Sequence, residues 1–134
     1  MSSFPVFSSK VASEVDVSAL ADGAVLGQPV DMARLTKVSV QAILQGITGA
    51  SGAAVIKLQA SDVNDYSGSS RPWSDNALHW VDVTSAEVAL VNGTNCVTFS
   101  AADLPSRYIR VVFDSDTDTI TAGTLDLWVT CKHG

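Results

Sequence analysis

Short runs in which apolar and polar residues alternate, separated by turn residues, occupy most of this chain. Because the side chains of a strand point to opposite faces in turn, each run predicts a strand with one apolar face. The runs cover residues 11–17, 36–45, 53–61, 79–83, 86–91 and 96–100, and the two long strands within 107–131. About seven or eight strands with no helical segment between them predict a single antiparallel β-sandwich, jelly-roll-like in type.

The last stretch, residues 107–131, shows the clearest alternation. Its apolar positions fall on one face of each strand, namely Ile109, Val111 and Phe113 in the first and Leu125, Leu127, Val129 and Cys131 in the second. The acidic loop between the strands predicts that they pair as neighbours and form one wall of the core. On the opposite face, regular pairing would place Arg110 over Trp128.

Two turns between strands are predicted from their residue types. The glycine-rich segment after residue 45 predicts a hairpin that joins 36–45 to 53–61, with Leu44 near Ile56, because glycine adopts the backbone conformations of tight turns. Asn92 to Asn95 forms a second predicted turn, since an Asn-Gly pair tolerates positive φ.

The N-terminal arm, residues 1–10, precedes the sandwich domain of residues 11–134. In this arm Phe4 and Phe7 flank Pro5, which favours an extended backbone. The arm is either a frayed terminus, a first edge strand of the same domain, or a segment that docks onto a neighbouring subunit.

The long loop, residues 62–78, is polar and has no periodicity. Loops of more than about 12 to 15 residues without secondary structure are often functional or disordered. This one carries Tyr66, Arg71 and Trp73, which are residue types favoured at the centres of interfaces. The alternative is that Trp73 folds back and closes one open end of the sandwich.

Charge and composition exclude several classes of partner. The 134 residues include 14 acids and 8 bases, for a net charge of −6, and no cluster of Lys or Arg. A nucleic-acid or anionic-membrane partner needs a basic footprint, so we expect neither. Residues 1–30 lack the pattern of a signal segment, and no window has the ~18 apolar residues of a membrane helix.

Side chains capable of catalysis or metal binding are sparse. Cys96 and Cys131 fall on predicted strands at core-facing positions, where they are expected as small buried residues rather than a disulfide. His79 and His133 lack the paired spacing of structural zinc sites. No nucleophile elbow or phosphate-binding glycine pattern occurs. We therefore expect a non-enzymatic protein with no catalytic residue, cofactor or metal.

The run from Asp114 to Asp118 is similar to the opening of a calcium-binding loop. That motif needs Gly at its sixth position and Glu at its twelfth, where this chain has Thr119 and Leu125. The run is expected to be a solvated turn tip. Weak calcium binding by Asp114, Asp116 and Asp118 is the alternative.

Three passages share an order of strands and turns with one group of proteins. They are GQPVDMARLTKVSVQAIL, then AAVIKLQASDVND followed by WVDVTSAEVAL, then FSAADLPSRYIRVVF with the closing TLDLWVTCK. Together, over residues 27–132, they resemble small β-sandwich virion proteins of tailed bacteriophages. The resemblance concerns fold, and the family has no site motif to carry across.

The resemblance implies a capsid decoration or cement protein. Such a protein is made in the host cytoplasm, binds the outside of the phage capsid and bridges subunits of the major capsid protein. We also expect a homo-oligomer, either a dimer or a trimer. The hypothesised contact residues are Phe4, Phe7, Tyr66, Arg71 and Trp73. The alternative is a carbohydrate- or receptor-binding module of a tail or fibre, with Tyr108 and Trp128 as an exposed aromatic platform.

Overall fold

Eight strands in two antiparallel sheets form the protein. The computed structural model describes residues 6–32, 35–62, 80–104 and 106–132. The strands are β1 (Val6–Asp16), β2 (Val25–Asp31), β3 (Lys37–Thr48), β4 (Val55–Ser61), β5 (Val81–Ala89), β6 (Gly93–Ala101), β7 (Tyr108–Asp114) and β8 (Ala122–Lys132), with a 3₁₀ turn, η1 (Val17–Ala19), after β1. Within these residues no helix is long and apolar enough to span a membrane.

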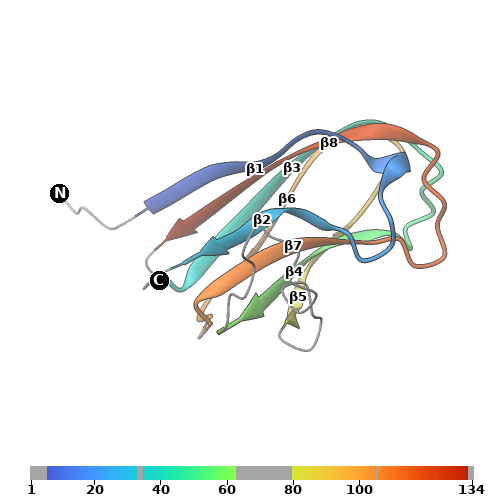
Figure 1. Cartoon of the computed structure of the whole chain (residues 1–134). Coiled ribbons are helices and arrows are strands. Elements are labelled where there is room, and N and C mark those ends of the chain that lie inside the picture. The colour runs from blue at the N-terminus through green and yellow to red at the C-terminus, as the bar shows by residue number, and fades with distance from the viewer. Residues whose placement is uncertain (1–5, 33–34, 63–79, 105, 133–134) are drawn as a thin grey trace.

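The two sheets pack face to face. Sheet A has the strand order β1-β8-β3-β6, and sheet B has the order β2-β7-β4-β5. Figure 1 shows them as an upper and a lower layer. This arrangement of eight strands is a jelly roll, so the predicted fold class is confirmed.

The core lies between the inner faces that the alternation predicted. In β3 the inward residues Val38, Val40, Ala42 and Leu44 are at most 1% exposed. The inward residues of β7 and β8 are buried in the same way. Each buried Val, Leu, Ile or Phe side chain contributes roughly 1.5–3 kcal/mol relative to exposure, so these rows are the main source of stability.

The predicted pairing of the last two strands is wrong. β7 lies in sheet B, between β2 and β4, whereas β8 lies in sheet A, between β1 and β3. Their apolar faces therefore form opposite walls of the core. Arg110 and Trp128 consequently lie on opposite outer surfaces and cannot stack on each other.

The predicted hairpin of residues 36–45 and 53–61 is also wrong. β3 pairs with β6 and β8, while β4 pairs with β5 and β7. The segment between β3 and β4 is an arch from one sheet to the other. The turn at Asn92 and Gly93 likewise connects β5 of sheet B to β6 of sheet A. In an arch, as in a hairpin, both apolar faces meet the same core, so alternation does not distinguish the two.

Two predicted strands, 79–83 and 86–91, form the single strand β5. A shift in its register against β4 lies between Lys57 and Gln59, and Ser85 has a φ of 63°. The polar residues that indicated a break therefore mark a bulge. A bulge bends an edge strand without ending it.

Candidate functional site

Of the five hypothesised contact residues, the structure describes only Phe7, and only its backbone. Phe7 lies in β1, opposite Cys131 of β8. Residues 6–10 of the predicted arm are thus part of the first strand of sheet A. The other hypothesised contact residues, Phe4, Tyr66, Arg71 and Trp73, lie outside the described residues. Their role stays a prediction.

A charged network covers the outer face of sheet B. Nζ of Lys57 lies 3.1 Å from Asp82 Oδ2 and 3.4 Å from Asp114 Oδ2. Burial lowers the pKa of Lys57, but the hydrogen bonds and charges of the two aspartates outweigh it and raise that pKa overall. The hydrogen bond from Gln59, with the Lys57 charge, holds the pKa of Asp82 below its ordinary value despite partial burial. Lys57 and Asp82 are therefore both charged at neutral pH.

Arg110 extends this network into a buried position. Its side chain is 6% exposed, and Nε donates a hydrogen bond to Gln59 Oε1 at 2.9 Å. Gln59 in turn donates from Nε2 to Asp82 Oδ1, also at 2.9 Å. The guanidinium carbon lies 4.5 Å from the centre of the Trp80 ring, and Trp80 is 4% exposed. Within the described residues, Arg110 thus contacts the ring of Trp80 and not the predicted Trp128.

Sequence reasoning did not find this network, although its signal is visible in the strands. Lys57 and Gln59 are two polar positions on one face of β4, and Arg110 occupies the equivalent face of β7. The register pairs Gln59 with Arg110 across the two strands. The sequence does not give this register, so it does not show that Gln59 and Arg110 lie side by side.

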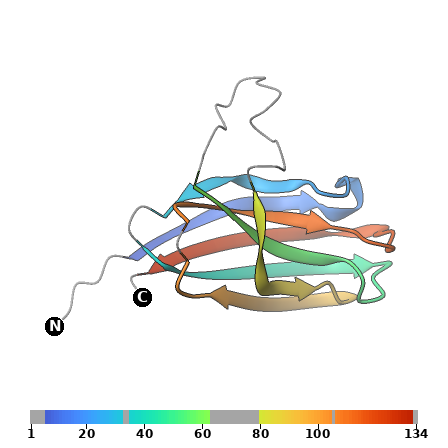
Figure 2. The same cartoon turned by 90° about the horizontal axis from the view of Figure 1, so that it is seen from below.

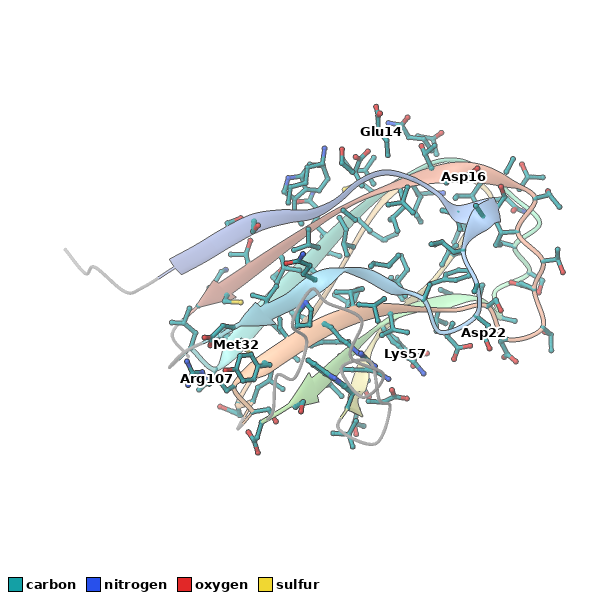
Figure 3. All side chains as sticks on the ribbon, in the orientation of Figure 1. Glu14, Asp16, Asp22, Met32, Lys57 and Arg107 are labelled. Atoms are coloured by element: carbon teal, nitrogen blue, oxygen red, sulfur yellow. The ribbon has the colours of Figure 1, made fainter. Side chains whose placement is uncertain are left out.

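A concavity of about 630 Å³ opens beside the network. It forms beside a bulge in β2. Between the regular pairs Leu26↔Val111 and Val30↔Ile109, the three residues Gly27 to Pro29 of β2 lie opposite the single residue Arg110 of β7, so β2 bends away from β7 there. Figure 3 shows Lys57 and Asp22 on this side of the molecule, and both line the concavity. The other lining residues are Gly23, Ala24, Val25, Gly27, Pro29, Gln59, Arg110, Val112 and Asp114. Its amide, carboxylate and ammonium groups suit a ligand rich in hydroxyl groups.

Small uncharged polar side chains dominate the outer face of sheet A. Two rows of register partners cross this sheet, Ser8–Thr130–Ser39–Ser100 and Lys10–Trp128–Gln41–Thr98. Nζ of Lys10 lies 4.9 Å from the centre of the Trp128 ring and 3.1 Å from Asp126 Oδ1. Trp128 is half-buried, and the Lys10 ammonium group lies over its ring. The predicted aromatic platform of Tyr108 and Trp128 is wrong, because Tyr108 lies in β7 of sheet B and Trp128 in β8 of sheet A, on opposite outer faces.

The acidic loop joins the two sheets at one end of the sandwich. Oδ2 of Asp118 accepts hydrogen bonds from the backbone N–H groups of Ser51, at 3.0 Å, and Ala54, at 2.9 Å, while the Ser51 hydroxyl donates to Oδ1. These bonds, led by that from the hydroxyl, lower the pKa of Asp118 to about 2. Asp118 thus fastens the β3–β4 arch. Among the described residues, no three His, Cys, Asp or Glu side chains are grouped to hold a metal ion.

The two cysteines are free and lie in different environments. Cys131 is fully buried in β8, and burial raises the pKa of its thiol to about 11. Cys96 is exposed on β6, where its sulfur accepts a hydrogen bond from Gln41 Nε2 at 3.2 Å. The predicted core-facing position is confirmed for Cys131 and wrong for Cys96. In β6 the inner face is instead the one that carries Val97 and Phe99.

Comparison with known proteins finds a likeness in fold. No protein-family model and no curated protein matches the sequence. Among solved structures, the SPBc2 prophage-derived protein YomS is similar, with a TM-score of 0.52 and 9% sequence identity. The alignment covers 98% of this chain and 96% of that chain. The jelly roll described above is thus shared over nearly the full length of both proteins.

Proposed function

We propose that this chain is a structural, non-enzymatic protein of a bacteriophage virion that decorates the outside of the capsid. The observation that carries the proposal is the shared fold with a prophage-derived protein over 98% of the chain. The resemblance of residues 27–132 to small virion β-sandwich proteins points in the same direction. The partner is then the major capsid protein, whose neighbouring subunits the chain bridges.

The bonding within the sandwich suits this role. A decoration protein must keep its shape while several separate contacts hold it on the shell. The Asp118 bonds fasten the β3–β4 arch, and the Lys57 network ties β4 to β5 and β7. Individually weak contacts with the shell then suffice, because binding through one contact raises the effective concentration at the other contacts.

The first test is the number of copies per virion. Quantitative mass spectrometry of purified particles measures this chain against the major capsid protein. Copies in the hundreds support capsid decoration. A handful of copies places the chain in the tail or fibre and contradicts decoration, and absence from particles contradicts any virion role.

A second test concerns the arm. Deletion of residues 1–5 leaves β1 intact, because that strand begins at Val6. If Phe4 helps to hold the protein on the shell, the shortened chain should fold normally but bind poorly to capsids stripped of the native protein. Circular dichroism checks the fold, and cosedimentation with capsids measures binding. Unchanged occupancy would remove the arm from the proposed contacts.

The concavity of about 630 Å³ supports one alternative, a glycan-binding module. Its hydrogen-bonding groups include the Gln59 amide on the outer face of sheet B. A glycan array probed with the wild type, Gln59→Ala and Gln41→Ala tests this role. Binding that Gln59→Ala abolishes and Gln41→Ala preserves would favour the alternative, because Gln41 lies on the outer face of sheet A.

A further inference from the structure

β6 is an edge strand without the features that normally protect an edge. It pairs with β3 on one side, and no other strand of the described residues pairs with its outer side. Figure 2 shows β6, coloured between yellow and orange, along the lower long side of the molecule. In an edge strand, every second residue directs its backbone N–H and C=O away from the sheet, which makes a template for another strand.

The sequence of β6 leaves this template open. The strand reads GTNCVTFSA and contains no charged residue and no proline. Its pairing with β3 is unbroken from Val38↔Ala101 to Leu44↔Asn95. Natural sheets block free edges with lysines, prolines, bulges or very short strands, and this nine-residue strand has none of these over that length.

The other three edges of the sandwich are protected. β1 has two register shifts against β8 and carries Lys10 and Glu14. β2 has a bulge and Pro29, and β5 has a bulge with Asp82 and Glu87. Among the edge strands of the described residues, β6 therefore differs from the other three.

We propose that β6 pairs with β6 of a second copy of this chain, antiparallel and around a two-fold axis. The two A sheets then form one continuous eight-stranded sheet. Pairing of a strand with itself is isologous, so both free edges are satisfied together and the assembly closes as a dimer. This inference goes beyond the virion role and does not depend on it.

Charge favours a second copy at this place. The chain has a net charge of −6, so two copies repel each other over most of their surface. On β6 the outward side chains are Thr94, Cys96, Thr98 and Ser100, and the neighbouring positions of β3 are Ser39, Gln41 and Ile43. The outward side chains of the paired β6 strands and of the adjacent β3 strands therefore bring no like charges into contact.

Register gives the proposal a definite geometry. An axis at Val97, the middle residue of the strand, places Cys96 opposite Thr98 of the second copy. It also places Asn95 opposite Phe99 of the second copy. Val97 and Phe99 are only partly buried in one chain, so the pairing removes further apolar surface from water.

The first experiment measures mass by sedimentation velocity over a wide concentration range. The wild type should sediment as a dimer. Thr98→Lys should sediment as a monomer, because pairing brings two lysines close together across the axis. Ser13→Lys is the matched control, since Ser13 is an exposed small polar residue on β1, the protected edge of the same sheet. This control should remain a dimer, and circular dichroism checks that both variants fold.

The second experiment needs no change in sequence. Cys131 is fully buried, so Cys96 is the accessible one of the chain's two cysteines. A short bismaleimide should link two chains through Cys96, and the linked dimer should be absent in Cys96→Ser. A monomeric wild type, a dimer that Thr98→Lys leaves intact, or a wild-type dimer without this crosslink would overturn the proposal. Pairing of β6 with a different protein in place of its own copy would overturn it as well.

Discussion

The outer faces of the two sheets use their polar side chains in different ways. On sheet B, Arg110, Gln59, Asp82 and Lys57 form one connected chain of hydrogen bonds. On sheet A, most outward side chains are small hydroxyl or amide groups with few bonds between strands. The polar side chains on the outer face of sheet B are therefore packed and bonded to one another, whereas most of those on the outer face of sheet A face solvent.

Burial along the central strands shows the same difference. In β8 of sheet A, buried and partly exposed residues alternate. In β7 of sheet B, five consecutive residues are buried, among them Arg110 and Val112 on the outward side. A strand that is covered on both faces loses its alternation. Polar residues of sheet B should therefore affect stability far more than those of sheet A.

Replacing Arg110 should have the largest effect. Arg110→Ala leaves a hole beside Trp80 and removes the donor to Gln59, so we expect a loss of roughly 2–4 kcal/mol in the free energy of unfolding. Chemical denaturation followed by fluorescence measures the loss. Ser39→Ala on sheet A is the control and should change stability by less than about 0.5 kcal/mol. Equal losses in the two variants would contradict the comparison.

Asp118 tests the connection between the sheets, and its removal should have the next largest effect. Its folded pKa of about 2 is below the ordinary 3.8, so its contribution is present in full above the ordinary value and disappears as the pH falls towards 2. Asp118→Asn should lower the Tm at neutral pH, and the gap to the wild type should close as the pH falls through this range.

Asp116→Asn is the control for that experiment, because Asp116 is an exposed residue of the same loop. Its melting curve should match that of the wild type at each pH. A gap between wild type and Asp118→Asn that stays constant with pH would show that the carboxylate charge is not the cause.

Lys57 should have a moderate effect. Lys57→Met leaves Asp82 and Asp114 without their shared cation, but their side chains are 58% and 35% exposed and water can solvate them again. We expect a loss of about 1 kcal/mol, and less at high salt, where exposed charges are screened. Denaturation at two salt concentrations measures it. A loss that does not change with salt would indicate that packing of the lysine stem dominates.

Gln41 should have the smallest effect. It lies on the outer face of sheet A, where its amide donates to the sulfur of Cys96. Gln41→Ala should change the free energy of unfolding by less than about 0.5 kcal/mol, as for most surface positions. A loss above about 1 kcal/mol, the size expected for Lys57, would mean that the face of sheet A also contributes to packing.

Local alternation of apolar and polar residues predicts most strands and most inward faces correctly. Alternation with a period of two requires only neighbouring residues, so Val38 to Leu44 and Leu125 to Cys131 were assigned correctly. The short strand after residue 95 was the exception. Its apolar Val97 and Phe99 alternate with Cys96, Thr98 and Ser100, but treating Cys96 as a small buried residue predicts the wrong face for it.

Which strands pair and which polar groups meet depends instead on the assembled sheets. An arch and a hairpin present the same alternation to the core, so the pattern predicts β7 and β8 as neighbours although they lie in opposite sheets. The position of Arg110 beside Trp80 follows from sheet membership, which depends on contacts between residues far apart in the chain. The open edge at β6 is decided in the same way, since a strand becomes an edge only when the order of the whole sheet is set.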